Sequence, residues 1–280
     1  MKILLTCHFP LQGSGSGIYT LNLAHALIKQ GHEVCVIMPE NEILPNEDEK
    51  GVVLRPVYFN GICDGALDFN FPCFTTHPRS TTTFNDLNDL QMSQYENAFT
   101  DKIAQVIDKF HPDLAHGGHI WLISYYLTKF DIPLVLTAHG TDLIGFRESV
   151  KFRPQANMAM EKAYACITIS NENERLVKEL FPDYAEKCKL ILNGYNPDVF
   201  FPEDIKVKNV LEIFGIEGDY KRIISFAGKF NSFKGIDILL NAAPYFEREN
   251  TALILAGDGV LFDDMNALAK ENDLKNTYFV

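Results

Sequence analysis

The most constraining feature of this 280-residue sequence is a regular alternation of short apolar runs with amphipathic segments. Apolar runs bounded by turn residues are typical of buried strands, and amphipathic segments between them are typical of covering helices. Together they predict an α/β fold built on a parallel sheet. In the first two thirds of the chain we predict strands at Ile3–Thr6, Val34–Met38, Val52–Val57, Leu114–Ala115, Leu134–Thr137, Cys166–Ile169 and Lys189–Leu192.

Two helices are expected between these strands. The first follows the glycine-rich stretch Gly13–Gly17 and ends at Gly31, a typical C-terminal cap. The second spans about Tyr95–Phe110. The first helix should bury a stripe made of Ile18, Leu21, Ala24, Leu27 and Ile28. These elements predict one Rossmann-like domain over residues 1–195.

A second α/β domain is expected over residues 196–280, which include a linker. The alternation pauses after Asn193 and restarts near Tyr220. The expected elements are strand Arg222–Ala227, helix Ile236–Ala243, strand Ala252–Ala256, helix Phe262–Glu271 and strand Thr277–Val280. Three strands are too few for a doubly wound sheet, so we expect this domain to be incomplete in the chain.

The composition argues against several classes of protein. The formal net charge is -12, so the chain lacks the clustered Lys and Arg that nucleic-acid binding requires. Its six cysteines form no CxxC pair, which indicates reduced core residues in a cytoplasmic protein. The opening apolar run is too short for a signal peptide, and no stretch has the roughly 18 apolar residues of a membrane span. Peripheral membrane association and the oligomeric state stay open.

The stretch Gly13-Ser14-Gly15-Ser16-Gly17 lies between the first strand and the first helix. Glycines let backbone N–H groups approach an anion, and a helix N-terminus favours negative charge. A phosphate or a sugar could bind there, although a purely structural turn is an alternative. A nicotinamide dinucleotide is disfavoured, because the spacing is GxGxG and five residues separate the strand from the first glycine.

A histidine follows the apolar run Leu134–Thr137, in the cluster His139-Gly140-Thr141-Asp142. Ligands of open α/β sheets bind outside the carboxyl ends of the strands, so His139 is a candidate for chemistry, with a purely structural histidine as the alternative. Asp142 either orients His139 or caps the following helix. His116 and His119 invite a metal interpretation, which we reject because no third ligand stands nearby.

The segment Asn60–Leu90 is long and irregular, and it contains aromatic residues, hydroxyl residues and Arg79. Loops of this length inside a domain are usually functional or mobile. Arg79 could bind a carboxylate or phosphate of a ligand, and a surface cover without a ligand is the alternative.

In the second domain, Gly228–Gly235 follows the first strand and carries Lys229 and Lys234. Two ammonium groups beside a helix start suit a leaving diphosphate, although lysines in a loop are more often only solvated. Gly257-Asp258-Gly259 follows the next strand, and we expect it to be a structural turn.

Taken in order, these motifs resemble those of the GT-B glycosyltransferases of family four, also called group 1 glycosyltransferases. The resemblance spans nearly the whole chain. It rests on the glycine-rich first loop, Gly31-His32-Glu33-Val34, Asp113-Leu114-Ala115-His116, His139-Gly140-Thr141-Asp142, Ile169-Ser170, Asn193-Gly194 with Phe200, Gly228-Lys229 to Lys234-Gly235, and Gly257-Asp258-Gly259. It implies two Rossmann-like domains that face each other across a cleft, the second domain holding a nucleotide-sugar and the first an acceptor.

The resemblance also implies the activity. A retaining transferase of this kind moves a sugar from a nucleotide-sugar to a hydroxyl of a glycan, a lipid or a small molecule, with no metal and no cofactor. His139 would be catalytic by hydrogen-bonding the transferred sugar. Backbone N–H groups of Gly15 and Gly17 would contact the donor phosphates or the acceptor. The lysines Lys229 and Lys234 would bind the donor phosphates, Lys229 replacing a more common arginine. The expected acceptor contacts are Arg79, His116 and Asp142.

One departure from the family pattern concerns the end of the chain. Two glutamates seven residues apart, which bind the donor in the family, would lie beyond Val280, so we expect the chain to be truncated and to have little transferase activity. Two other classes stay open: a sugar- or nucleotide-binding remnant, and another GT-B enzyme such as an epimerase or a phosphorylase.

Overall fold

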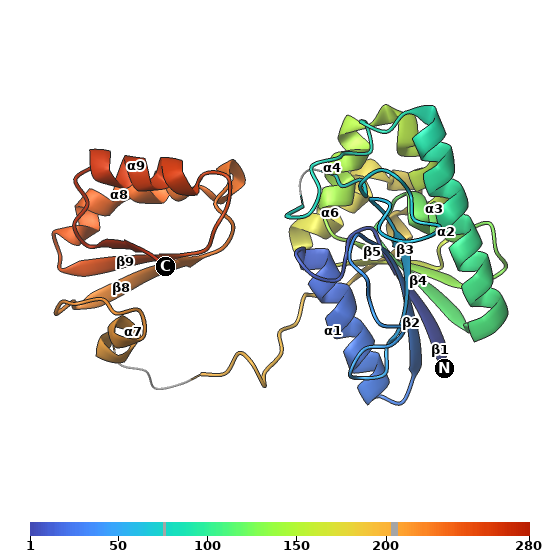
Figure 1. The fold of residues 1–280 in the computed structure, drawn as a ribbon, viewed down its shortest axis with the longest axis horizontal. Helices are drawn as coiled ribbons and strands as arrows, with labels where there is room; N and C mark the ends of the chain where they lie inside the picture. The colour runs from blue at the N-terminus through green and yellow to red at the C-terminus, as the bar shows by residue number, and fades with distance from the viewer. Residues whose placement is uncertain (75–76, 203–206) are drawn as a thin grey trace. The chain divides into compact units, whose positions relative to one another are not determined.

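The computed structural model describes residues 1–74, 77–202 and 207–280. Within them the chain divides into unit 1, Met1–Gly194, and unit 2, Tyr195–Val280 (Figure 1). Each unit has its own sheet, and each sheet is covered by helices from its own stretch of sequence.

Unit 1 is built on a seven-stranded sheet in the order β3-β2-β1-β4-β5-β6-β7. All neighbouring strands are parallel, so all seven carboxyl ends lie at the same edge. The chain moves outward in one direction from β1 to β3 and in the other from β4 to β7, which makes the junction of β1 and β4 the switch point of the sheet. The strands are β1 (Lys2–Cys7), β2 (Glu33–Glu40), β3 (Val53–Tyr58), β4 (Leu114–Gly118), β5 (Leu134–Ala138), β6 (Ala165–Thr168) and β7 (Cys188–Leu190).

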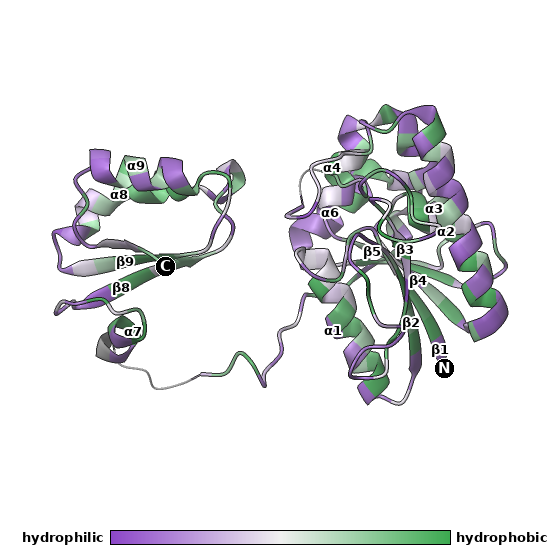
Figure 2. Cartoon of the chain, viewed as in Figure 1, coloured by the Kyte–Doolittle hydropathy of each residue, from purple (hydrophilic) through white to green (hydrophobic). Residues whose placement is uncertain are grey.

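Helices cover both faces of this sheet, and Figure 1 shows α1 and α2 on opposite sides of it. The strands are apolar and the helices are apolar on their inner sides (Figure 2), as the alternation in the sequence predicts. The helices of unit 1 are α1 (Gly15–Lys29), α2 (Asp89–Phe110), α3 (Leu122–Leu127), α4 (Thr141–Glu148), α5 (Arg153–Lys162) and α6 (Asn171–Leu180), with single turns η1 (Val150–Phe152) and η2 (Pro182–Lys187).

Helix α1 ends before Gly31, as the sequence predicts, but it begins at Gly15, inside the glycine-rich stretch that we expected to precede it, and its buried face also differs. Ser14 is the N-cap and accepts a hydrogen bond from the Gly17 N–H, and Gly31 follows the last turn with a φ of 84°. The expectation that Ile18 is buried is wrong, because 40% of it is exposed. Gly17 and Thr20 are buried instead, since the start of the helix packs closely on the loop that precedes it.

Unit 2 has a three-stranded parallel sheet in the order β10-β9-β8. Two hydrophobic clusters contact it: Leu240 and Leu253 belong to one, and Leu211 with Ile254 to the other, because alternate residues of β9 face opposite sides. The predicted strand Arg222–Ala227 and helix Phe262–Glu271 are confirmed, and a helix at 207–213 was not predicted. The elements are α7 (Val207–Ile213), β8 (Arg222–Ala227), η3 (Ser232–Lys234), α8 (Ile236–Glu247), β9 (Thr251–Ala256), α9 (Phe262–Glu271) and β10 (Thr277–Phe279).

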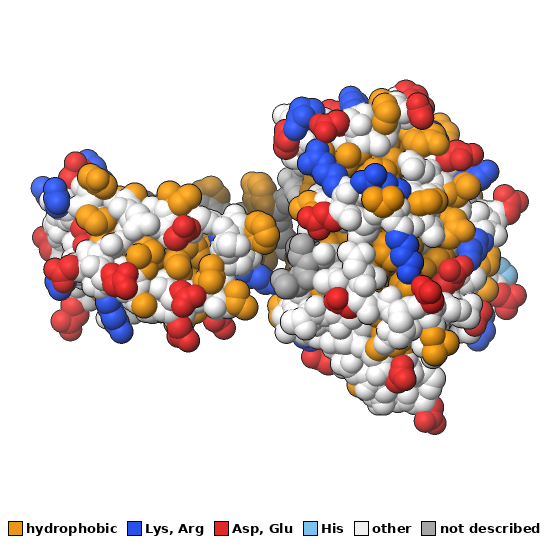
Figure 3. All heavy atoms as spheres, turned by 90° about the horizontal axis from the view of Figure 1, so that it is seen from above, with side chains coloured by type: hydrophobic (Ala, Val, Ile, Leu, Met, Phe, Trp, Pro, Cys, Tyr) orange, Lys and Arg blue, Asp and Glu red, His pale blue; other side chains and the backbone are white. Residues whose placement is uncertain are grey.

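The surface carries charges of both signs. On the face shown in Figure 3, acidic and basic side chains of unit 1 are interspersed with apolar ones. In the described part of the chain, no helix has both the length and the apolar character needed to cross a membrane.

Candidate functional site

Three histidines gather at the carboxyl edge of the sheet in unit 1. His8 follows β1, His119 follows β4 and His139 follows β5, and these three strands are neighbours. The ring centroids of His8 and His119 are 5.2 Å apart, and those of His119 and His139 are 4.9 Å apart. His8 and His119 are fully buried, whereas His139 is partly exposed at the rim. The cluster therefore lies at the switch point, where open α/β sheets bind their ligands.

Burial keeps these imidazoles neutral. It lowers the pKa of His8 to about 3 and that of His139 to about 4, and it takes the pKa of His119 well below its ordinary value. The backbone N–H of Ile123 donates to Nε2 of His8 at 3.0 Å, so neutral His8 carries its proton on Nδ1. At neutral pH the cluster offers hydrogen bonds rather than positive charge.

His139 is held through its backbone by Asp142. Oδ1 of this fully buried carboxylate accepts hydrogen bonds from the N–H groups of His139 at 3.1 Å and Gly140 at 2.8 Å. Its Oδ2 accepts from the N–H of Ile120 at 2.9 Å, which ties the loop after β4 to the loop after β5. Asp142 thus orients His139 through the main chain and not through the ring. Its predicted contact with an acceptor stays a prediction.

His116 lies on β4, three residues before His119, and has a different partner. Its Nε2 is 2.6 Å from Oγ1 of Thr137 on β5, and burial lowers its pKa to about 4. His119 instead lies among the aromatic rings of Phe9 and Phe74. Across residues 1–74, 77–202 and 207–280, no group of three or more His, Cys, Asp or Glu side chains is arranged to hold a metal ion.

The glycine-rich loop is shaped largely by contacts inside unit 1. The N–H of Gly17 is bonded to Oγ of Ser14 at 3.0 Å, and a Cβ at this position would lie 2.2 Å from the carbonyl oxygen of Pro10. Gly15 is exposed, with open space where a Cβ would be. Of the two predicted phosphate contacts, Gly15 therefore faces solvent, whereas the N–H of Gly17 already donates to the capping side chain of Ser14. Both roles stay predictions.

The described part of the long segment 60–90 covers the histidine cluster. The ring of Phe74 lies 6.0 Å from that of His8 and 5.4 Å from that of His119, and Phe84 lies 6.2 Å from His8. His77 reaches the glycine-rich loop, where its Nε2 is 3.2 Å from the carbonyl oxygen of Gln12. Thr75 and Thr76, which belong to the predicted functional loop, lie outside the described residues.

Arg79 anchors this segment to the end of β2. Its guanidinium donates to both carboxylate oxygens of Glu40, at 2.6 and 3.2 Å, and lies 3.0 Å from the carboxylate of Glu42. Two carboxylates thus neutralise the arginine that we expected to bind an acceptor anion. The role of Arg79 in acceptor binding stays a prediction, while its observed contacts join the segment to the end of β2.

The lysines of unit 2 are presented differently. Lys229 and Lys234 are both exposed in the loop after β8. The side chain of Lys234 makes no hydrogen bond or ion pair with the residues that the structure describes. A Cβ on Gly257 would lie 2.0 Å from the carbonyl oxygen of Gly228, so the loop Gly257–Gly259 packs directly beneath the lysine loop. This close approach supports the structural role expected for Gly257-Asp258-Gly259.

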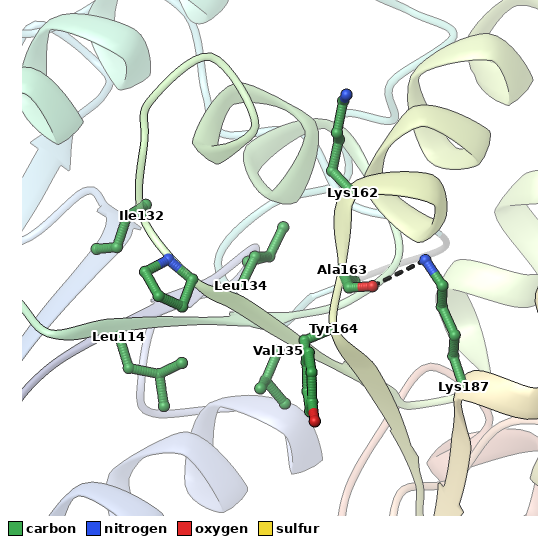
Figure 4. Close-up of a pocket in the computed structure, with 9 residues that line it drawn as sticks. Leu114, Ile132, Leu134, Val135, Lys162, Ala163, Tyr164 and Lys187 are labelled. Atoms are coloured by element: carbon green, nitrogen blue, oxygen red, sulfur yellow. Dashed lines mark hydrogen bonds between the residues drawn. The ribbon is translucent and has the colours of Figure 1, made fainter.

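A cavity of about 520 Å³ lies at the other edge of the sheet in unit 1 (Figure 4). Leu114 and Leu134, which line it, are the first residues of β4 and β5, so the cavity is at the amino ends of the strands. Lys187 points its ammonium at the C-terminal end of α5, where it donates to the carbonyl oxygens of Met160, Glu161 and Ala163. None of the predicted site residues lines this cavity, and the carboxyl edge is the better candidate.

The histidine-bearing unit matches a known family. Residues 13–199 match the model of Glycosyltransferase Family 4, a stretch that runs from the glycine-rich loop through His139 to the end of unit 1. The chain belongs to glycosyltransferase family 4. The family predicted from the order of the sequence motifs is thereby confirmed.

Two relatives of this family-4 chain come from Methanocaldococcus jannaschii, and both are described as uncharacterized glycosyltransferases. MJ1607 is 26% identical over 286 residues, which cover 96% of this chain and 66% of the relative. MJ1178 is 28% identical over 148 residues, which cover 53% of this chain and 36% of the relative. The chain therefore spans 66% of the length of the first relative and less of the second.

Solved structures show the fold of this family-4 chain. Sucrose-phosphate synthase from Thermosynechococcus elongatus matches with a TM-score of 0.71 and 17% identity, covering 100% of this chain and 70% of that one. Anabaena Alr3699/HepE, solved in complex with UDP and glucose, matches with a TM-score of 0.62 and 15% identity, covering 100% and 69%. The fold is GT-B, as the sequence predicts.

The sequence did not point to several residues that shape this site. His8 and Tyr19 contact the candidate histidines, Phe74 covers them, and Glu40 holds Arg79. His8 directly follows a predicted strand, as His139 does, and that shared placement is a signal that could have found it.

Proposed function

We propose that this family-4 chain transfers a sugar from a nucleotide-sugar donor to a hydroxyl acceptor with retention of configuration and without a metal. The observation that carries the proposal is His139, a neutral imidazole presented at the carboxyl rim of the sheet by β5 and held there by Asp142. The nucleotide donor is supported by Anabaena Alr3699/HepE, which was solved with UDP and glucose.

In this proposal the bond between the sugar C1 and the diphosphate breaks while a bond from C1 to the acceptor oxygen forms on the same face. The acceptor proton passes to an oxygen of the leaving diphosphate. His139 hydrogen-bonds the transferred sugar, and its neutral state lets it do so without opposing the positive charge that develops on the ring.

Negative charge builds on the diphosphate as it leaves, and Lys229 and Lys234 stabilise it in this proposal. Lysine supplies the charge but cannot form the bidentate hydrogen bonds of arginine, so we expect it to bind phosphate more weakly than arginine would. In this proposal the N–H of Gly15, an exposed residue at the start of α1, adds a neutral contact. On the acceptor side, His116, Arg79 and Asp142 are the proposed residues, with Arg79 acting through the segment it anchors.

The test is turnover with a panel of UDP-, GDP- and ADP-sugars, followed through release of the nucleoside diphosphate. We expect His139→Ala to lower the rate at least about tenfold and to leave the affinity for the free nucleoside diphosphate nearly unchanged. Product anomers resolved by NMR test retention, and activity in EDTA tests metal independence. Equal rates for the variant and the parent chain would remove His139 from catalysis.

The same assay separates the alternatives. Epimerised donor without an acceptor would indicate an epimerase, and a requirement for inorganic phosphate would indicate a phosphorylase. Nucleotide binding without any turnover would indicate a binding protein. Each of these results would replace the transferase assignment.

A further inference from the structure

Two other rings contact the ring of His139. Tyr19, in the second turn of α1, packs edge-on against it, with the ring centroids 4.8 Å apart and the ring planes at 76°. The second ring is that of His119, with the centroids 4.9 Å apart and the planes at 50°. Tyr19 and His139 are both partly exposed, whereas His119 is fully buried. Tyr19 is therefore the outer wall of the site in which the imidazole sits.

The hydroxyl of Tyr19 lies near Thr137, which is fully buried on β5 two residues before His139. The same Thr137 hydroxyl lies 2.6 Å from Nε2 of His116 on β4. Tyr19 thus lies close to β5, the strand that ends directly before His139, although it belongs to α1.

Among the described residues, no side chain orients the imidazole of His139 by a hydrogen bond. Nε2 of His139 is buried without a hydrogen-bond partner there. Asp142 binds the backbone N–H of His139 and not its ring. Histidines that act in catalysis usually have one nitrogen bonded to an orienting group, which sets the tautomer and the ring rotation. In this chain the neighbouring rings must perform that task.

We propose that Tyr19 is a positioning residue, whose ring holds the imidazole of His139 in the orientation that meets the sugar. The kinetic part of this inference rests on the proposed function, whereas the orientation of the ring does not. An edge-to-face contact suits the role because it restrains ring rotation without forming a bond that would occupy a nitrogen. The contact also couples His139 to the first turns of α1.

A kinetic cycle tests the proposal. We expect Tyr19→Leu to lower kcat about tenfold and to leave the KM for the donor within about twofold. Tyr19→Phe keeps the ring and loses only the hydroxyl, so its kcat should stay within about threefold of the parent. In the His139→Ala background, Tyr19→Leu should lower kcat by less than about twofold, because a positioning residue acts only through the residue that it positions.

A spectroscopic readout needs no activity. The ring signals of His139, assigned by their loss in His139→Gln, are followed through a pH titration by NMR. Release of the ring to solvent in Tyr19→Leu should raise the pKa of His139 from about 4 towards its ordinary value, whereas Tyr19→Phe should retain the low pKa. The other titratable histidines around the ring, His8, His116 and His119, are neutral throughout most of this range.

The outcomes are distinguishable. If no donor is turned over but the Tyr19→Leu titration shifts, the proposed function fails and the positioning role stands. The positioning role is wrong if Tyr19→Leu lowers kcat by the same factor in the parent and in His139→Ala. It is also wrong if the substitution raises only KM or leaves the pKa of His139 unchanged. Tyr164→Leu is the matched control, because this tyrosine is 87% exposed and lines the cavity at the opposite edge of the same sheet. It should change neither kcat nor the titration.

Discussion

The two units present their candidate residues in opposite ways. Unit 1 offers buried imidazoles whose pKa values are lowered, those of His8, His116, His119 and His139, and all eight histidines of the chain precede Tyr195. Unit 2 contains no histidine and offers Lys229 and Lys234 on an exposed loop. Buried imidazoles depend on packing for their position, whereas exposed ammonium groups act through charge that water and salt screen. The comparison predicts that acid and changes in packing lower the stability of unit 1, while ionic strength changes ligand binding by unit 2.

The largest expected effect is loss of stability of unit 1 in mild acid. In the folded chain the pKa values of His8, His116 and His139 are about 3, 4 and 4, whereas the ordinary value is 6.5. Between pH 6.5 and the folded pKa of each histidine, the unfolded chain therefore binds more protons than the folded chain. Stability therefore falls as the pH drops from 6.5 towards 4, by up to about 1.4 kcal/mol per pH unit for each histidine.

Trp121 makes this measurable, because it is the single tryptophan of the chain, lies in unit 1 and is 1% exposed. Urea unfolding followed by its fluorescence at pH 7, 6 and 5 should show a falling midpoint. Unit 2, followed by far-UV circular dichroism after unit 1 has unfolded, should change little until carboxylates protonate near about pH 4. A urea midpoint, measured by Trp121 fluorescence, that stays constant from pH 7 to 5 would contradict the predicted difference between the units.

The next effect sharpens the contrast within the glycine-rich loop. Gly17→Ala should destabilise unit 1 by about 2–3 kcal/mol, because the added Cβ would meet the Pro10 carbonyl oxygen at 2.2 Å. Gly15→Ala meets no atom within 4 Å and should be neutral or stabilising by about 0.5 kcal/mol. Urea unfolding of the two variants side by side is the measurement. Similar losses in both would contradict the close packing at Gly17.

The smallest effect concerns the charge of unit 2. Lys234→Ala should weaken UDP binding about fivefold, on the order of 1 kcal/mol, and Lys234→Arg should restore it. Calorimetry at low and high salt should show the difference between parent and variant shrinking as salt screens the ammonium group. Affinity that is insensitive to both substitution and salt would mean that this loop does not bind the diphosphate.

Much of the fold could be predicted from the sequence because its signals are local. The apolar runs gave the strands of both sheets, and β8 and α9 have the predicted bounds. The C-terminal cap of α1 was equally readable, since Gly31 acts within a few residues of the helix end, whereas the sequence analysis did not identify Ser14 as the N-cap. Ile18 was misplaced because helix periodicity marks one face but does not say how wide the covered stripe is.

The candidate site was predictable only in outline. His139 could be found because β5 ends directly before it. Since the strands pair in parallel, a residue at that position lies at the carboxyl edge of the sheet. The partners of Arg79 could not be found, because Glu40 lies 39 residues earlier and only the folded segment brings the two together. The same holds for Asp142, whose contact with the N–H of Ile120 joins two loops that are distant in the chain.

The sequence by itself determined the parallel α/β architecture, the family and the residue types available for chemistry. Periodicity, caps and motif order act over a few residues, so they survive without knowledge of the folded chain. The tertiary structure alone decided which groups are neutral, which are already paired and which restrain one another. Those properties depend on burial and on contacts between distant segments, as in the ring of Tyr19 against His139 and the carboxylates around Arg79.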